Sequence, residues 1–400
     1  LSFKQNIQHY KFLVNSFLPI AGNRQEIKKN NIDKLFFFKV LFTFMLIDFP
    51  TILMSKNIGL DFSPLMTDTV GGIPTFIKNL SNNLAHFNYD LKYFQCYKFS
   101  RLKKFWKLYP KPKNFKRIFY DKNFVKPLKK LNVFHGTAEW LPLKLTNIPK
   151  IITIHDTRGL DNDISLEKRY DVKYAAIKYA ANIIVTVTYT IKNELLNKIK
   201  NLDEKKIKVI HSGYNENFKN ISDISKKEQI LFVGTIAKNK NVIGLIQAFK
   251  IVNEKYKDIK LIICGQATDK EYYNELKTFI CNNSLEKKIE FIYNADNEDL
   301  LKLYNESLIF ILPSFYEGFG LPVLEAQACG CPVIISEQPA LLEITNNSAI
   351  KSKIGDVNDL TKKIITLLNN KTLQQKLIKS GFENIKAFSW KITAKKYIDL

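Results

Sequence analysis

The chain has 400 residues, of which 46% are hydrophobic and 25% are charged, so it is long and apolar enough to form two globular domains with full cores. The formal net charge of +23 at pH 7 predicts attraction to anionic partners: nucleic acid, acidic membrane lipids or phosphorylated small molecules. The five cysteines form no C-x-x-C pair and no Cys/His cluster with zinc spacing, which excludes a zinc motif and indicates a reducing compartment.

Residues 1–56 do not resemble the rest of the chain, and we predict that they form an N-terminal extension. The run 35–54 is strongly apolar but carries Lys39 and Asp48, and its uncharged core at 40–47 is too short to span a bilayer. This favours a buried or interfacial segment over a transmembrane helix, and the run lacks the small-residue cleavage pattern of a signal peptide. The role of the extension stays open.

A regular alternation of strands and helices begins at Asn57. A strand predicted at 57–65 leads to a turn at Gly71-Gly72, and apolar residues then repeat at helical spacing. They are Ile73, Phe76, Ile77, Leu80 and Leu84. A strand, a glycine turn and a helix make a corner of the type that binds phosphate, although an ordinary tight turn explains two glycines nearly as well.

Residues 92–130 combine 14 Lys or Arg residues with 11 aromatic residues and one acid, Asp121. Basic and aromatic side chains together suit an anionic bilayer surface, where each Lys or Arg contributes about 1 kcal/mol of attraction. The same mixture could neutralise single-stranded nucleic acid and stack on its bases. A third interpretation is a solvated basic face whose rings pack inward.

Short apolar strands follow at 132–137, 150–156, 182–188 and 206–214, with a helix at 166–181. This alternation predicts a parallel sheet. His135 and His155 lie at the ends of two of these strands, on the edge where such sheets bind ligands, although histidine often has a structural, hydrogen-bonded role. Asp161-Asn162-Asp163 has the Asp-x-Asp form of a metal site, which we reject because it lies in a polar loop rather than directly after a strand.

A polar stretch at 215–228 is the best linker candidate, and a second α/β series follows it. We predict strands at 229–235, 259–265, 288–293, 307–313 and 331–336, and helices at 241–256, 270–281, 297–304, 321–329, 356–369 and 372–386. The predicted fold class is therefore α/β, with two doubly wound Rossmann-like domains facing across a cleft. Their bounds are 57–214 and 229–385, and a final helix at 386–400 is expected to pack back on the first domain.

The motif with the clearest chemistry lies after the apolar run 308–312, which indicates a buried strand. In Glu317-Gly318-Phe319-Gly320-Leu321-Pro322, two glycines and a proline predict a tight turn into a helix. Exposed amides at such a helix N-terminus bind anions, and Glu317 and Glu325 bracket that site. The layout fits a ligand with a central diphosphate and a sugar at each end. The simpler alternative is a loop carboxylate and a charge placed for the helix dipole.

A further phosphate-type corner lies in the same half of the chain. Gly234-Thr235 ends the first predicted strand of this half, and Lys238, Lys240 and Asn241 lead into the next helix. A lysine at such a corner is a point charge suited to phosphate. Lysine is common throughout the chain, so only its position distinguishes Lys240.

Together these motifs resemble the family-4 retaining glycosyltransferases of the GT-B fold, also called glycosyl transferases group 1, over residues 57–400. The most specific element is E-x7-E, from Glu317 to Glu325. The supporting elements are the Gly71-Gly72 turn, TIHD at 153–156, KIKVIHSGYNENF at 206–218, VGTIAKNKN at 233–241 and Phe388-Ser389-Trp390.

The chain departs from the usual pattern of this family in two places. Asn239-Lys240 stands where the family usually has Arg-Lys, which leaves one cation in place of two unless Lys238 substitutes for the arginine. His211-Ser212-Gly213 stands where Pro-Asn-Gly is usual, so the contacts of the crossing segment could differ while its turn glycine is kept.

The resemblance implies transfer of a sugar from a nucleotide-diphosphate donor with retention at the anomeric carbon. By analogy, Glu325 would bind the ribose, Glu317 would hold the transferred sugar, Lys240 would neutralise the diphosphate and His155 would lie beside the reacting sugar. Further donor contacts are expected from Gly318, Phe319, Gly320, Leu321, Gly234, Thr235 and Lys238. The phosphate or acceptor side is expected to include Gly71, Gly72 and His135. Neither a metal ion nor a cofactor other than the donor substrate is expected.

The leading hypothesis is a hexosyltransferase, with mannose as a first guess, that builds a surface polysaccharide such as lipopolysaccharide, or a glycolipid. Its partners would be a nucleotide sugar, a saccharide or lipid-linked acceptor and an anionic membrane surface, with no specific nucleic acid. Its expected location is cytoplasmic, at the inner face of the membrane. One alternative is a nucleic-acid-binding protein that uses residues 92–130, which would leave Glu317 and Glu325 unexplained. Another is a GT-B phosphorylase or epimerase.

Overall fold

The computed structural model describes residues 57–66, 71–86, 92–98, 115–120, 125–145, 147–160 and 173–400. These residues belong to one compact unit, Lys56–Leu400. The extension predicted at 1–56, the segment Asp161-Asn162-Asp163 and much of the basic aromatic stretch lie outside the described residues. In the described part of the chain, no helix is both long enough and apolar enough to cross a membrane.

The first half of the unit forms a seven-stranded sheet in the order β3-β2-β1-β4-β5-β6-β7. Every neighbouring pair in it is parallel. The strands are β1 (Asn57–Asp61), β2 (Lys92–Lys98), β3 (Phe115–Tyr120), β4 (Val133–Gly136), β5 (Lys150–Ile154), β6 (Ile183–Thr186) and β7 (Ile207–Val209). The strand order reverses between β1 and β4, and doubly wound sheets bind ligands at the carboxyl ends of the strands beside such a point.

The second half forms a six-stranded parallel sheet in the order β10-β9-β8-β11-β12-β13. The strands are β8 (Lys227–Val233), β9 (Lys260–Cys264), β10 (Ile289–Ile292), β11 (Ser307–Leu312), β12 (Val333–Ser336) and β13 (Ile350–Ser352). Here the order reverses between β8 and β11, so the segments that follow these two strands meet at one edge.

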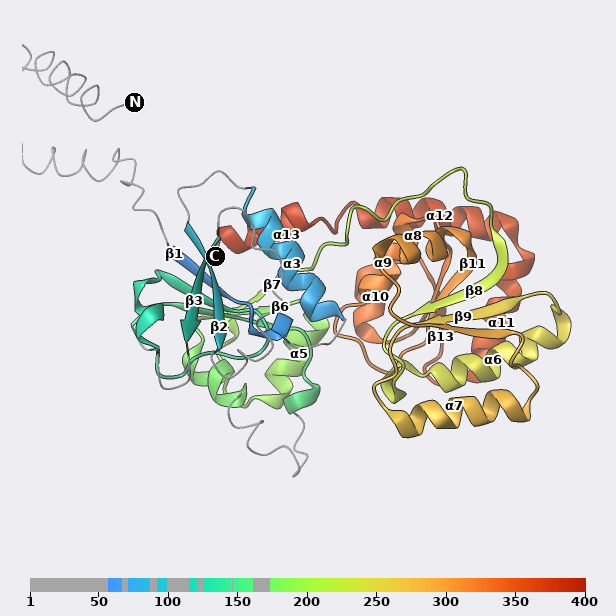
Figure 1. The fold of residues 1–400 in the computed structure, drawn as a ribbon, viewed down its shortest axis with the longest axis horizontal. Helices are drawn as coiled ribbons and strands as arrows, with labels where there is room; N and C mark the ends of the chain where they lie inside the picture. Colours follow the sequence, from blue (N-terminus) through green and yellow to red (C-terminus); the bar gives the residue numbers. More distant parts are fainter. Residues whose placement is uncertain are drawn as a thin grey trace, which may run out of the picture. The chain divides into compact units, whose positions relative to one another are not determined.

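Helices connect the strands and cover both sheets (Figure 1). They are α3 (Gly72–Leu84), α5 (Tyr189–Lys198), α6 (Val242–Lys255), α7 (Lys270–Asn282), α8 (Asn297–Glu306), α9 (Leu321–Ala328), α10 (Pro339–Thr345), α11 (Val357–Asn369), α12 (Lys371–Ile385) and α13 (Trp390–Ile398). Shorter helical turns are η1 (Ser63–Met66), η3 (Lys126–Lys130), η4 (Arg158–Leu160), η6 (Ala176–Ala180), η7 (Glu204–Lys206) and η8 (Lys238–Lys240).

Side chains fix where several of these helices begin. Thr188 caps α5 by accepting a hydrogen bond from the Ile191 amide at 3.2 Å, and Asp269 caps α7 in the same way. Asp296 and Asp299 form a capping box at the start of α8. Each cap satisfies an amide that the helix leaves without a partner and typically stabilises by about 1 kcal/mol.

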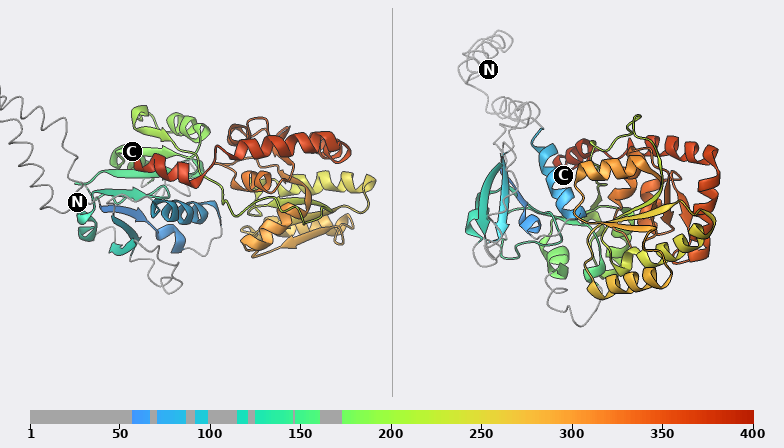
Figure 2. Two further views of the ribbon diagram at one scale, coloured as in Figure 1. Left: turned by 90° about the horizontal axis from the view of Figure 1, so that it is seen from above. Right: turned by 45° about the vertical axis from the view of Figure 1, so that its right-hand side comes forward.

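The last helix, α13, returns to the first sheet and packs on α3 (Figures 1 and 2). Trp390 and Tyr397 of α13 are buried in one apolar cluster with Phe76 of α3 and Leu60 of β1. A parallel bridge joins Tyr214 to Ser389, and the Thr393 hydroxyl donates to the His211 carbonyl at 2.8 Å. The chain therefore crosses between the halves twice, and the two crossings are bonded to each other.

The predicted α/β class, with two doubly wound sheets, is confirmed. The sequence did not predict β2 and β3, nor the short elements α10 and β13. In the described parts of the basic aromatic stretch, Tyr93, Phe94 and Tyr120 are at most 5% exposed, so these rings pack inward. The strands were missed because lysines interrupt the apolar pattern that predicts a strand. An edge strand such as β3 can carry an exposed lysine, as it does at Lys116.

We predict that Gly213→Ala destabilises the fold. A Cβ at Gly213 would meet backbone atoms of Ser389 and Trp390, which cannot move aside as a side-chain tip could. Overpacking of this kind costs about 1–3 kcal/mol, measurable as a lower unfolding midpoint. Gly72→Ala is the matched control, because a Cβ there meets nothing within 4 Å and the residue is helical. Equal unfolding midpoints for the two variants would show that the close contact of Gly213 with Ser389 and Trp390 is not needed for stability.

Candidate active site

The loop 313–320, which we call the Glu317 loop, joins the end of β11 to the start of α9. Gly320 lies directly before α9 with φ 106°, and a Cβ there would also come within 2.6 Å of Leu341. Pro322 lies in the first turn of α9, where its missing N–H is not needed. The sequence thus forces a sharp turn at the carboxyl edge of the sheet, and the turn presents the N-terminal amides of α9 there.

Glu317 is almost buried, with 8% of its surface exposed. Its Oε1 lies 2.6 Å from the Lys240 Nζ and accepts a hydrogen bond from the Ser314 hydroxyl at 2.8 Å. The Gln338 amide holds the Glu317 carbonyl at 3.1 Å. Lys240 is therefore not an unpaired cation awaiting phosphate, as the sequence alone would suggest, but half of a nearly buried ion pair.

The loop that carries Lys240 is attached to the Glu317 loop. Lys240 ends η8, and the Asn239 carbonyl accepts from the Phe315 amide at 2.9 Å. Lys238, the proposed substitute for an arginine, begins the same turn and is exposed to solvent. Gly234 packs closely against Gly265, and a Cβ added to Gly265 would collide with the Gly234 carbonyl. The structure thus joins Lys240 and Glu317, while Lys238 lies apart on the surface.

Glu325 is the second carboxylate of the E-x7-E element and lies within α9, where it is 8% exposed. The Tyr304 hydroxyl of α8 donates to its Oε2 at 3.0 Å. Burial raises the pKa of Glu325 to about 7, because the charged form loses its hydration. This carboxylate therefore changes its charge near neutral pH.

His155 follows β5, at the carboxyl edge of the first sheet. Its Nε2 lies 2.8 Å from the Thr137 carbonyl, which can only accept, so Nε2 carries the proton. The Phe76 ring packs edge-on against the imidazole at a centroid distance of 4.6 Å. Burial lowers the pKa of His155, so the ring is neutral at pH 7.

His135 does not share this setting. It is 3% exposed, its ring stacks on Tyr397 at 5.1 Å, and its Nε2 is hydrogen-bonded to the Thr153 hydroxyl at 2.7 Å. Burial lowers its pKa to about 3. The structure favours a packing role for His135 over the acceptor-side role that its position at a strand end suggested, since a ligand cannot reach the covered ring.

Gly71 and Gly72 open α3 and are both exposed, and a Cβ at either would meet nothing within 4 Å. As far as the described residues extend, the space beside them is therefore open to a ligand or to water. Across the described ranges, no group of three or more His, Cys, Asp or Glu side chains could hold a metal ion.

Direct contacts bring the Glu317 loop to His155. A Cβ on Gly318 would meet the His155 carbonyl, and the Thr188 hydroxyl donates to the Gly318 carbonyl at 3.1 Å. Glu343 of α10 accepts from the amides of Tyr189 and Thr190 at 2.8 and 3.0 Å, so it caps a helix of the first half from the second. Residues predicted from separate motifs thus meet at one place.

Several charged residues beside His155 were not predicted from the sequence. Arg158 pairs with Asp156 at 2.9 Å, and Lys173 pairs with Glu139 at 2.7 Å. Glu139 also accepts from the Asp156 amide at 3.1 Å, which fixes the segment after β5. Of these residues, Arg158 is the one that the sequence could have suggested, because it lies two positions after the TIHD motif. Glu139 and Lys173 have no local signature.

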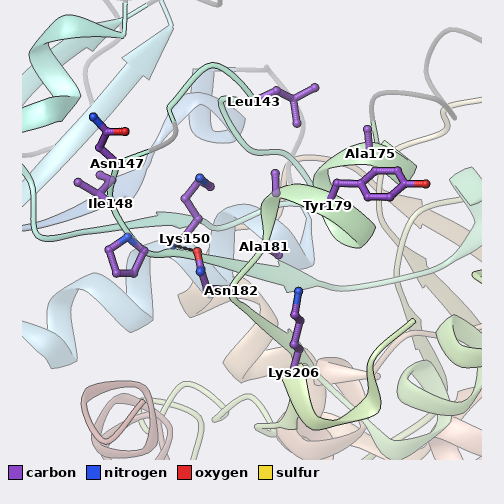
Figure 3. A pocket seen from close by; sticks show the side chains of 11 residues that line it. Leu143, Asn147, Ile148, Lys150, Ala175, Tyr179, Ala181, Asn182 and Lys206 are labelled. Carbon is purple, nitrogen blue, oxygen red and sulfur yellow. Dashed lines mark hydrogen bonds between the residues drawn. The ribbon is translucent and has the colours of Figure 1, made fainter. Parts of the chain in front are cut away.

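A pocket of about 700 Å³ lies elsewhere, at the amino ends of β5, β6 and β7 (Figure 3). Its lining includes Lys150, Asn182 and Lys206, which begin or precede these strands, together with the exposed Tyr179. None of the residues predicted for the site lines it. Because it opens at the opposite edge of the sheet from His155, it is not the place where the motifs meet.

Comparison with known proteins gives results consistent with this geometry. Residues 214–384 match the family described as glycosyl transferases group 1. An uncharacterized glycosyltransferase of Methanocaldococcus jannaschii is 28% identical over 338 residues, which are 80% of this chain and 91% of that protein. O-antigen chain mannosyltransferase RfbU of Salmonella typhimurium is 31% identical over 206 residues, which are 50% of this chain and 55% of the relative, so the chain spans about half of its length.

Among solved structures, Anabaena HepE in complex with UDP-glucose superposes with a TM-score of 0.71 at 13% identity. The superposition covers 86% of this chain and 98% of HepE. An identity this low speaks for the fold alone, which is the GT-B fold with its two parallel-sheet halves. The Glu317 loop, Lys240 and Glu325 all lie within residues 214–384, the region that matches glycosyl transferases group 1, and the chain has the GT-B fold.

Proposed function

We propose that this protein is a retaining hexosyltransferase that moves a sugar from a nucleotide-diphosphate donor to a saccharide or lipid-linked acceptor in surface polysaccharide or glycolipid synthesis. Glycosyltransferase activity is supported by the family match and by the relatives. The observation that carries the finer proposal is the Glu317–Lys240 pair, held at the N-terminus of α9 and beside His155.

The donor is proposed to bind by dividing this ion pair. A diphosphate bound at the amides of α9 would attract Lys240, since the two phosphate groups together carry two negative charges and Glu317 carries one. Glu317 would then accept hydrogen bonds from hydroxyls of the transferred sugar, while Glu325 accepts from the ribose. Each partner of the pair thereby gains a new partner on the substrate, which avoids leaving a buried charge unpaired.

For the transfer itself, we propose that the bond between the anomeric carbon and the diphosphate oxygen breaks through an oxocarbenium-like transition state. Negative charge grows on the departing diphosphate, where Lys240 and the α9 amides stabilise it without a metal ion. The acceptor hydroxyl attacks from the same face, and its proton passes to the departing phosphate. His155 is neutral, and its Nε2 proton is donated to the Thr137 carbonyl. The imidazole would therefore line that face of the sugar in a fixed position without adding a charge.

The transferred sugar is proposed to be a hexose, with GDP-mannose and UDP-glucose as the first donors to test. The Salmonella relative is an O-antigen chain mannosyltransferase, and HepE was crystallised with UDP-glucose. A thermal-shift panel of UDP, GDP, ADP and dTDP sugars identifies the base, because bound donor raises the unfolding temperature.

We also propose that the enzyme works at the inner, cytoplasmic face of a membrane, where a lipid-linked acceptor would lie. The support is the net charge of +23 and the exposed lysines at β3 and η3. Because Tyr93, Phe94 and Tyr120 are buried, the proposed attraction rests on charge rather than on inserted aromatic side chains.

The first prediction concerns the ion pair. Lys240→Ala and Glu317→Gln are each expected to lower kcat/KM of sugar transfer by about 10²–10³. The first removes a group that stabilises the developing charge on the diphosphate, and the second removes the charged acceptor that positions the transferred sugar. Transfer is measured with the donor found in the panel. Lys287→Ala, a change at an exposed lysine, is expected to match the wild type. Turnover is expected to survive EDTA. Full activity in both site variants would refute this site.

The second prediction concerns pH. An ionised Glu325 accepts ribose hydrogen bonds better than the acid, so donor affinity should fall as pH drops through its pKa of about 7. Between pH 8 and pH 6, loss of the ionised form weakens binding by about tenfold. An intact nucleotide sugar is the probe, since its diphosphate does not titrate in this range. Glu325→Gln should bind with little pH dependence, and an unchanged slope in this variant would exclude Glu325 as the titrating group.

The third prediction concerns the membrane. The protein is expected to co-sediment with vesicles that contain anionic phospholipid at low salt and to be released at high salt, because Debye screening shortens the attraction. Charge reversal should weaken binding when it replaces Lys116, Lys126, Lys129 and Lys130, all exposed. The matched control reverses four exposed lysines of the second half, namely Lys257, Lys260, Lys277 and Lys287. If the protein bound the vesicles at neither salt concentration, the proposed membrane association would be wrong.

A further inference from the structure

Tyr316 directly precedes Glu317 and contacts the two other segments that carry proposed catalytic residues. Its main chain lies against the Lys240 loop, where the Asn239 carbonyl accepts from the amides of Phe315 and Tyr316 at 2.9 and 3.4 Å. Its side chain points to the first half of the protein and is only partly buried. No motif had indicated this residue.

The Tyr316 hydroxyl is hydrogen-bonded to two residues of the first half, Glu194 and Thr157. It donates to Glu194 Oε2 of α5 at 2.9 Å and accepts from the Thr157 amide at 3.1 Å. Glu194 Oε2 also accepts from the Thr157 hydroxyl at 2.5 Å, which closes a small network. Burial raises the pKa of Tyr316, so the phenol stays protonated and continues to donate at physiological pH.

This network holds the segment that bears His155. Thr157 is two residues beyond His155, and its carbonyl accepts from the Lys198 ammonium at 3.1 Å. The Arg158 guanidinium lies 5.3 Å from the centre of the Tyr316 ring, a cation–π contact that leaves the hydroxyl free for its two bonds. The hydroxyl can form these bonds only when the two halves of the protein are together.

We propose that Tyr316 is a positioning residue that couples the approach of the two halves to the arrangement of Glu317, Lys240 and His155. It touches these residues' segments rather than the reacting atoms, so its hydroxyl would act by keeping the acceptor side close and water out during transfer. The inference rests on the proposed function, since it assigns a means of closure to that same site.

Other hydrogen bonds that join the halves do not involve this hydroxyl. Thr188 donates to the Gly318 carbonyl at 3.1 Å, and Glu343 accepts from Tyr189, Thr190 and His211. A variant without the hydroxyl is therefore expected to fold and to bind a nucleoside diphosphate, whose proposed partners lie in the second half. What it should lose is precision in the sugar and acceptor positions.

Tyr316→Phe is the test, because it removes the hydroxyl and keeps the ring on which Arg158 stacks. The expected result is a fall of about ten- to hundredfold in kcat of transfer, the scale of a small misplacement of reacting groups. The Kd for the nucleoside diphosphate should stay within about twofold, and the share of donor lost to water should rise. If the hydroxyl were merely structural, its removal would lower the unfolding temperature but would not lower kcat while leaving the Kd unchanged.

The matched control is Tyr256→Phe, whose hydroxyl donates to Asn369 at 2.8 Å between α6 and α11 and contacts no proposed site residue. It loses the same atom and one comparable hydrogen bond, and its kcat and hydrolysis share are expected to equal those of the wild type. Glu194→Ala should resemble Tyr316→Phe, and the double variant should be no worse than the worse single one, because both side chains act through one hydrogen-bond network that holds Thr157.

Wild-type kcat and hydrolysis share in Tyr316→Phe, or additive losses in the double variant, would overturn the proposal. If the wild type turns over no nucleotide sugar, the proposed function fails, while the contact itself is still measured by hydrogen exchange. The Thr157 amide donates to the Tyr316 hydroxyl, so Tyr316→Phe is expected to speed exchange at Thr157 relative to Tyr256→Phe. Unchanged exchange there would overturn the coupling independently of any activity.

Discussion

The Glu317–Lys240 ion pair is the interaction on which the rest of the site depends. At 2.6 Å, with side-chain exposures of 9% and 19%, it keeps two opposite charges out of water at the end of β11. Removing either partner would leave the other charge buried, which costs far more than the pair contributes. Ser314 satisfies a further lone pair of Glu317, so the resting site is neutral and closely bonded rather than an open positive pocket.

The position of this pair is set from both halves of the protein. The second half supplies the Gly320 turn and the Asn239 carbonyl, which hold the Glu317 and Lys240 loops together. The first half supplies His155, whose ring rests on Phe76 of α3, and Phe76 in turn packs against Trp390 of α13 at 5.6 Å. Because α13 is the C-terminal helix, the packing behind His155 depends on residues at the far end of the chain.

The sequence sufficed where the determinants are local. An apolar run followed by two glycines and a proline predicts a strand, a turn and a helix start, and this placed Glu317 and the α9 amides without a structure. It failed where partners are distant: Tyr316 and Glu194 are 122 positions apart, and neither has a signature. The burial of His135 likewise depends on Tyr397, whose ring covers it from the last helix.

On the proposed function, the resting pair also bears on how the product leaves. An intact donor offers phosphate to Lys240 and sugar hydroxyls to Glu317, so both halves of the divided pair are satisfied. After transfer, the nucleoside diphosphate retains only the first contact, and the Glu317 charge is left with the Ser314 hydroxyl but without a cation or sugar hydroxyls. Re-forming the bond between Glu317 and Lys240 restores the neutral site and competes with the remaining phosphate contact. The same ion pair that donor binding must divide therefore favours product release.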